Sequence, residues 1–158
     1  MPSVVAVCDI RTMNVMKGAY PKYRKGEDHP SGALWVGTDT SIETMVFMIG
    51  HYANKAKLTI LRIFAHASTD KITLGANPLD LITADDFGRQ LRINKLLSQS
   101  ARIELHCCKA VDDSSSVWQG LANAANAEVW ASPDLQDGKT IGFDGRLVKF
   151  RPKSFGKK

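Results

Sequence analysis

The feature of this sequence that most constrains its fold is the alternation of short apolar runs with segments of helical periodicity. The apolar runs at 3–10, 57–66, 101–108 and 128–132 are rich in β-branched or aromatic residues, which is typical of strands. Strands that alternate with amphipathic helices predict a mostly parallel central sheet. We therefore expect a three-layer α/β fold with helices on both faces of the sheet.

The helices are recognised by residues that can cap their first turns. Thr40, with Glu43 three residues later, forms a capping box at the start of the first helix. Thr83 is expected to cap the second helix, and either Ser114 or Ser115 is expected to cap the third. Each of these helices lies between two of the apolar runs, as crossover connections require.

Further strands are predicted outside these four apolar runs. Residues 33–38 form a possible second strand, and residues 71–75 a possible hairpin arm. Residues 139–150 are expected to form a C-terminal hairpin that turns at Asp144-Gly145, a favourable turn dipeptide. One domain accounts for residues 1–158, with residues 151–158 expected to be a flexible tail.

Composition excludes several classes of protein. Three cysteines are an odd count that suits a reducing compartment better than a disulfide framework. The chain has no basic leader and no apolar run of about 20 residues, so we expect a cytoplasmic protein without a membrane segment. The net charge is +5, but basic residues are scattered among acidic ones, and no nucleic-acid partner is predicted. No cofactor is implied.

Two strand ends carry residues capable of chemistry. The strand that begins at Lys57 ends at His66, and the strand that begins at Ala101 ends at Cys107 and Cys108. Ligands and catalytic groups collect at the carboxyl ends of parallel strands. If these strands are neighbours, an imidazole and a thiol reach the same edge of the sheet, which is what a Cys–His pair requires.

Three other interpretations of these residues remain open. A histidine at the end of a buried strand can be purely structural, and buried cysteines can be inert apolar residues. A metal site built from His66, His106, Cys107 and Cys108 is a further option, but the CxxC spacing common in zinc sites is absent. No metal site is therefore predicted.

Strand parity does not decide between the two thiols, because they face opposite sides of the strand. Cys108 adjoins Lys109 and a polar loop, so we expect it to be the more exposed, and a neighbouring cation lowers a thiol pKa. Cys8 lies within the first strand and is expected to be part of the core.

Three stretches occur in a distinctive order: "FAHASTDKITLG", "LHCCKA" and "WASPDLQDGKTIGFDGRLVKF". From about Lys57 to Phe150 the chain resembles an uncharacterised bacterial caspase-like domain found in the N-terminal parts of large secreted repeat proteins. That family has a strand ending in "SHG", a later strand ending in "YGC", and an "ASTDLTG" stretch before a terminal hairpin. The wider resemblance is to caspases, gingipains and related cysteine peptidases.

The resemblance implies roles for individual residues. The family's histidine corresponds to His66 and its cysteine to Cys108, while Ala67 and Cys107 stand where the family has glycine. The backbone N–H groups of Ala67 and Cys108 would bind the oxyanion. Cys107, Lys109 and Asp70 are possible supporting residues.

The resulting hypothesis is a cysteine peptidase of caspase-like fold that acts on a protein or peptide substrate. Cys108 would be the nucleophile and His66 would protonate the leaving amine. The alternative is a caspase-like interaction module that has lost efficient catalysis, which the replacement of two glycines by Ala67 and Cys107 favours.

Overall fold

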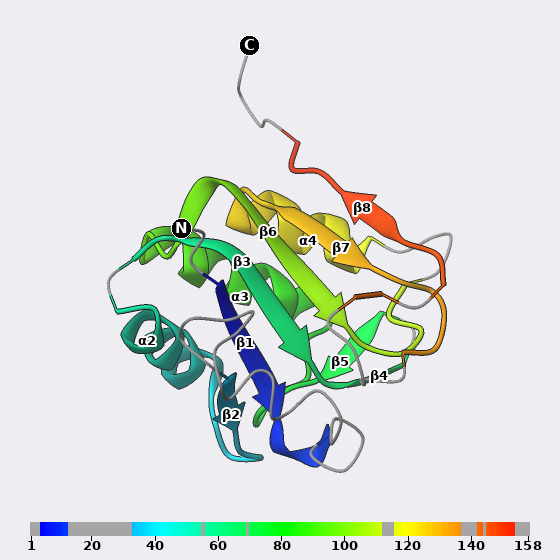
Figure 1. Ribbon diagram of the computed structural model, residues 1–158, viewed down its shortest axis with the longest axis horizontal. Coiled ribbons are helices and arrows are strands. Elements are labelled where there is room, and N and C mark those ends of the chain that lie inside the picture. The colour runs from blue at the N-terminus through cyan, green and yellow to red at the C-terminus, as the bar shows by residue number, and fades with distance from the viewer. Residues whose placement is uncertain are drawn as a thin grey trace.

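The computed structural model describes residues 4–12, 33–54, 56–68, 70–111, 116–136, 142–143 and 145–153 (Figure 1). Its elements in chain order are β1 (Val4–Asp9), the 3₁₀ helix η1 (Ile10–Thr12), β2 (Ala33–Val36), α2 (Ile42–Tyr52), β3 (Leu58–Phe64), β4 (His66–Ser68), β5 (Lys71–Thr73), α3 (Leu81–Ile93), β6 (Leu97–His106), α4 (Val117–Ala125), β7 (Glu128–Ala131) and β8 (Val148–Phe150).

A six-stranded sheet with the order β2-β1-β3-β6-β7-β8 forms the centre of the protein. Every neighbouring pair is parallel except β7–β8, so the prediction of a mostly parallel sheet is confirmed. All six residues of β1 are buried, as expected of a strand covered on both faces. The strands β4 and β5 form a separate antiparallel hairpin, in agreement with the hairpin arm expected at 71–75.

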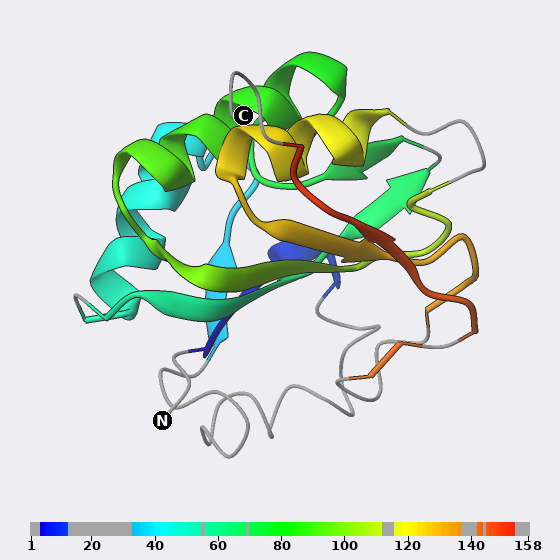
Figure 2. The ribbon, with the colours of Figure 1, turned by 90° about the horizontal axis from the view of Figure 1, so that it is seen from above.

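All three described α-helices lie on one face of the sheet, as Figure 2 shows. Here α3 packs against both α2 and α4, and the buried side chains of the three helices join one core. Alternate residues of the strands face this core, among them Leu61, Ile63, Ile103, Leu105 and Val129. We call the opposite side the second face. The helices expected on the second face are not found among the described residues; the stretch 13–32 lies outside them.

The helix starts differ from those predicted. Ser41, not Thr40, caps α2 by accepting a hydrogen bond from the Thr44 N–H, while the Thr40 hydroxyl accepts from the Gly37 N–H. Asp80 caps α3 in place of Thr83, because its carboxylate accepts from two N–H groups of the first turn. The N-cap of α4 is Ser116, and the predicted Ser114 and Ser115 lie outside the described residues.

The C-terminal strand β8 pairs with β7 in antiparallel orientation. Most of the preceding arm expected for its hairpin lies outside the described residues. Gly145 has the left-handed backbone (φ +74°) expected of the predicted turn, but Asp144 and residues 137–141 lie outside the described residues. At the start of the expected flexible tail, the Arg151 carbonyl and the Lys153 N–H form hydrogen bonds to side chains of α4. Residues 154–158 lie outside the described residues.

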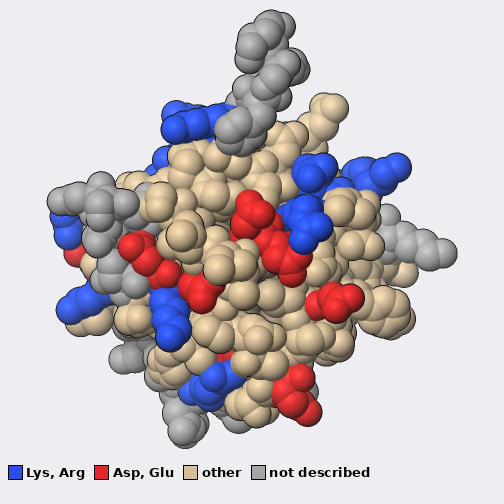
Figure 3. Space-filling view, turned by 180° about the vertical axis from the view of Figure 1, so that it is seen from behind, with Lys and Arg blue, Asp and Glu red and all other residues tan. Residues whose placement is uncertain are grey.

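Figure 3 views the face that bears the helices. Asp and Glu side chains are spread across the middle of this face, with Lys and Arg between them and along its margins. None of the helices in the described parts of the chain is both long and apolar enough to cross a bilayer.

Candidate active site at the carboxyl ends of the strands

The strands β1, β3, β6 and β7 all end at one edge of the sheet, at the lower right of Figure 1. In the parallel pair β3–β6, Phe64 lies opposite His106. His66 and Cys108 each follow two residues later. The two predicted residues therefore lie just beyond the carboxyl ends of adjacent strands, at the same edge.

His66 is exposed and begins the β4–β5 hairpin. Its Nε2 lies 3.1 Å from the carbonyl oxygen of Arg11, which comes from η1. A carbonyl oxygen can only accept a hydrogen bond, so Nε2 carries the proton in the neutral ring. The other ring nitrogen, Nδ1, is then the one able to accept a proton.

The position of Arg11 depends on Asp9, the fully buried last residue of β1. Asp9 Oδ1 accepts from the Arg11 backbone N–H and from Arg11 Nε, both at 2.9 Å. Asp9 Oδ2 accepts from the Gly75 N–H at 2.8 Å, and Arg11 Nη2 donates to the Gly75 carbonyl at 2.5 Å. A buried carboxylate thus ties the end of β1 to the turn after β5. Sequence reasoning missed this role, although an Asp that ends an apolar run was the available signal.

The three thiols differ in burial. Cys107 is 1% exposed, and burial raises its pKa; burial also raises the pKa of Cys8 to about 12. Cys108 is the one cysteine that is not fully buried, as the sequence predicted. Its Sγ accepts from the Gln136 N–H at 3.3 Å and donates to the Gln136 carbonyl at 3.2 Å. The backbone N–H and carbonyl of Gln136, in the chain beyond β7, therefore both contact this thiol. We call this pair of contacts the bracket around Cys108.

The three sequence stretches quoted above meet at this edge through their backbones. Lys109 N–H donates to the Asp134 carbonyl at 3.0 Å, and Ala110 N–H donates to the Ser132 carbonyl at 3.1 Å. The Ala110 carbonyl in turn accepts from the Asp70 N–H at 3.3 Å. The loop that carries Cys108 is thereby held between the first and the third stretch.

The remaining predicted residues occupy different surroundings. Ala67 is half-buried and packs against the hydrophobic core, and Cys107 lies within that core. Lys109 is exposed, and both Lys109 and Asp70 have left-handed backbones. No hydrogen-bond partner of the buried Asp70 Oδ1 is found in the part of the chain that the structure describes.

His106 does not belong to the candidate dyad. It is buried between Phe64 and Phe143, with ring centroids 4.7 Å and 4.2 Å away, and its Nε2 lies 2.8 Å from Glu104 Oε1. Over the described residues, no cluster of three or more histidine, cysteine or acidic side chains could hold a metal ion.

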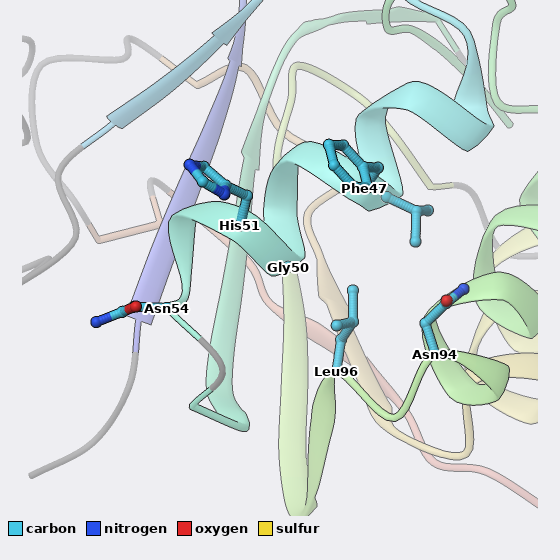
Figure 4. A pocket seen from close by; sticks show the side chains of 7 residues that line it. Phe47, Gly50, His51, Asn54, Asn94 and Leu96 are labelled. Atoms are coloured by element: carbon cyan, nitrogen blue, oxygen red, sulfur yellow. The ribbon is translucent and has the colours of Figure 1, made fainter.

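A cavity of about 460 Å³ lies at the opposite edge, near the amino ends of β3 and β6. Figure 4 shows Phe47 and His51 projecting from α2, with Asn94 and Leu96 on the chain between α3 and β6. Its lining is mostly apolar, and its position separates it from His66 and Cys108.

Comparison with known proteins identifies one family. The model of a family described as a domain of unknown function (DUF4347) matches residues 32–149, which are 118 of the 158 residues. The chain therefore belongs to this family. No curated protein matches the sequence.

Proposed function

We propose that this member of the DUF4347 family is a cysteine peptidase of caspase-like fold, with Cys108 as nucleophile and His66 as its acid–base partner. The observation that carries the proposal is the placement of both residues beyond the carboxyl ends of the adjacent parallel strands β3 and β6. The Arg11 carbonyl at His66 Nε2 supports it further, because it can orient the imidazole as a third residue does in a triad.

The reaction would proceed in two steps. The Cys108 thiol passes its proton to His66, and the thiolate attacks the peptide carbonyl carbon to form a C–S bond. The C–N bond then breaks, and the departing amine takes the proton from the His66 imidazolium. Water hydrolyses the resulting thioester and regenerates the thiol. Backbone N–H groups of Ala67 and Cys108 would hold the oxyanion, each worth about 3 kcal/mol.

The packing of Ala67 and Cys107 is compatible with this chemistry. Both residues contribute to the hydrophobic core. Cys107 is thus buried in the core, Ala67 is half-buried against it, and His66 is exposed.

The test is alkylation of the full-length protein by iodoacetamide at neutral pH, followed by mass spectrometry of each cysteine. Cys108 should react at least about tenfold faster than Cys8, and His66→Ala should slow that reaction. The matched control is His51→Ala, which removes an exposed histidine at the opposite edge. The peptidase proposal fails if the rate at Cys108 is unchanged by His66→Ala.

A second function, a non-catalytic interaction module of the same fold, is favoured by the bracket around Cys108. The Gln136 carbonyl accepts the thiol proton, and it would lie against a thiolate without a hydrogen bond. If the bracket persists in solution, all three cysteines should react slowly and the protein should cleave no member of a peptide library. Fast, His66-dependent labelling together with cleavage would exclude the module.

A further inference from the structure

A row of polar side chains crosses the second face of the sheet. In register, Arg62 of β3 lies beside Glu104 of β6, Glu104 lies beside Trp130 of β7, and Trp130 lies beside Lys149 of β8. The neighbouring residues along β3, β6 and β7 point into the helix-covered core, so this row faces the other way. The row lies on a face of the sheet, whereas His66 and Cys108 lie beyond the carboxyl ends of β3 and β6.

The row contains a buried ionic cluster built around Glu104. Glu104 Oε1 accepts from Arg62 Nε at 2.9 Å and from His106 Nε2 at 2.8 Å, while Oε2 accepts from Arg102 Nε at 2.6 Å. Burial favours a raised pKa for Glu104, but the hydrogen bond from His106 and the charges around it hold the pKa at about 2. Burial lowers the pKa of His106, so its ring is neutral at pH 7. Two guanidinium groups therefore face one carboxylate.

Arg102 is the member of the cluster best placed to meet a ligand. Its side chain is 31% exposed, and its guanidinium lies 4.1 Å from the centre of the Trp130 ring. Among the described residues, only its Nε has a hydrogen-bond acceptor. Its terminal nitrogens keep the fork geometry that binds carboxylate or phosphate oxygens in pairs.

A cavity of about 520 Å³ opens over this cluster. The sheet supplies Arg62, Arg102, Glu104 and Trp130 to its lining, and the chain before β8 supplies Phe143 and Leu147. The volume falls in the range of about 300–1,000 Å³ that is usual for small-molecule sites. The cavity thus combines a floor of two arginines and one glutamate with aromatic and apolar walls.

We propose that this cavity binds a small organic anion in which a carboxylate or phosphate is attached to an aromatic ring. The oxyanion pairs with the Arg102 guanidinium, and the ring packs against Phe143 and the edge of Trp130, because the Arg102 and Lys149 cations already lie over the Trp130 ring. Glu104 does not repel the ligand strongly, because each of its oxygens already accepts from a positively charged or polar donor. Its role is to hold the two arginines in place.

Calorimetric titration of the full-length chain with phenyl phosphate and with benzoate tests the site and distinguishes the two oxyanions. Benzyl alcohol lacks the charge and inorganic phosphate lacks the ring, so each should bind at least about tenfold more weakly than phenyl phosphate. Arg102→Gln should weaken binding about tenfold or more, and Arg102→Lys should restore only part of it. Arg89→Gln is the matched control, because it removes a guanidinium from α3 on the other face.

A measurement on the unaltered protein guards against misfolded variants. The ligand should shift the indole N–H signal of Trp130 in a nitrogen-15 spectrum and leave that of the buried Trp118 in place. Binding should also persist in Cys108→Ser, so the result is independent of the peptidase proposal. The proposal is overturned if neither anion binds at millimolar concentration, if benzyl alcohol binds as well as phenyl phosphate, or if Arg102→Gln has no effect.

Discussion

Glu104→Gln removes the charge at the centre of the ionic cluster while nearly preserving the volume of the side chain. The pKa of Glu104 falls from its ordinary value of 4.5 to about 2 in the folded protein. At about 1.4 kcal/mol per pKa unit, this difference corresponds to about 3 kcal/mol of stability at neutral pH. Because Glu104 is only 3% exposed, solvent screens little of this energy. The variant should therefore lose about 3 kcal/mol, within the range of about 3–5 kcal/mol found when a buried ion pair is broken.

The sign of the pH dependence follows from the lowered pKa. A carboxyl group whose pKa is depressed by folding contributes its full stabilisation above its unfolded pKa, and loses it as the pH falls through the folded pKa. The gap in unfolding free energy between the wild type and Glu104→Gln should therefore be widest near neutral pH. It should shrink between about pH 4.5 and pH 2 as Glu104 takes up its proton.

Urea unfolding followed by circular dichroism, repeated at several pH values, measures this gap. Glu128→Gln is a suitable control, because Glu128 is more exposed and its ion pair with Arg151 lies at the surface. A gap for Glu104→Gln that stays constant with pH, or that is no larger than the gap for Glu128→Gln, would refute the reasoning. Either result would mean that the ion pairs of Glu104 with Arg62 and Arg102 do not stabilise the folded protein by the amount given above.

Two further variants test other parts of the structure. Asp9→Asn turns one of the two acceptor oxygens that hold Arg11 and Gly75 into a donor, so urea unfolding should show a loss of about 3 kcal/mol. The same variant should slow alkylation of Cys108, if the Arg11 carbonyl positions His66 for catalysis. Gly88→Ala places a methyl carbon 2.9 Å from the Leu121 carbonyl oxygen, so the melting temperature should fall by an amount equivalent to about 1–3 kcal/mol, and an unchanged value would show that α3 and α4 separate freely.

The strands of the parallel sheet could be predicted from the sequence because each is a short apolar run. The exact residue at which each helix begins could not be predicted. Thr40 and Ser41, for example, are both good capping residues, and only the local backbone selects between them. Asp80 and Thr83 are likewise both good capping residues; Asp80 is the N-cap of α3, and Thr83 is the N3 residue that completes the capping box. Local propensity therefore identified the elements but not their first turns.

The polar networks were harder to predict than the strand ends. His66 and Cys108 could be related because each follows an apolar run and parallel strands end together. Asp9 bonds to Gly75, which is 66 residues away, and Arg62 bonds to Glu104, 42 residues away. Such pairs depend on the register between strands, and nothing in a single sequence fixes that register.

The bracket around Cys108 consists entirely of main-chain atoms of Gln136. Every amino acid except proline offers the same amide and carbonyl, so substitution at this position need not alter how the sulfur is held. Distant relatives could therefore hold the cysteine in the same way while differing in the amino-acid sequence of the segment after β7. A search keyed to backbone geometry should recover such proteins where pattern matching would pass them over.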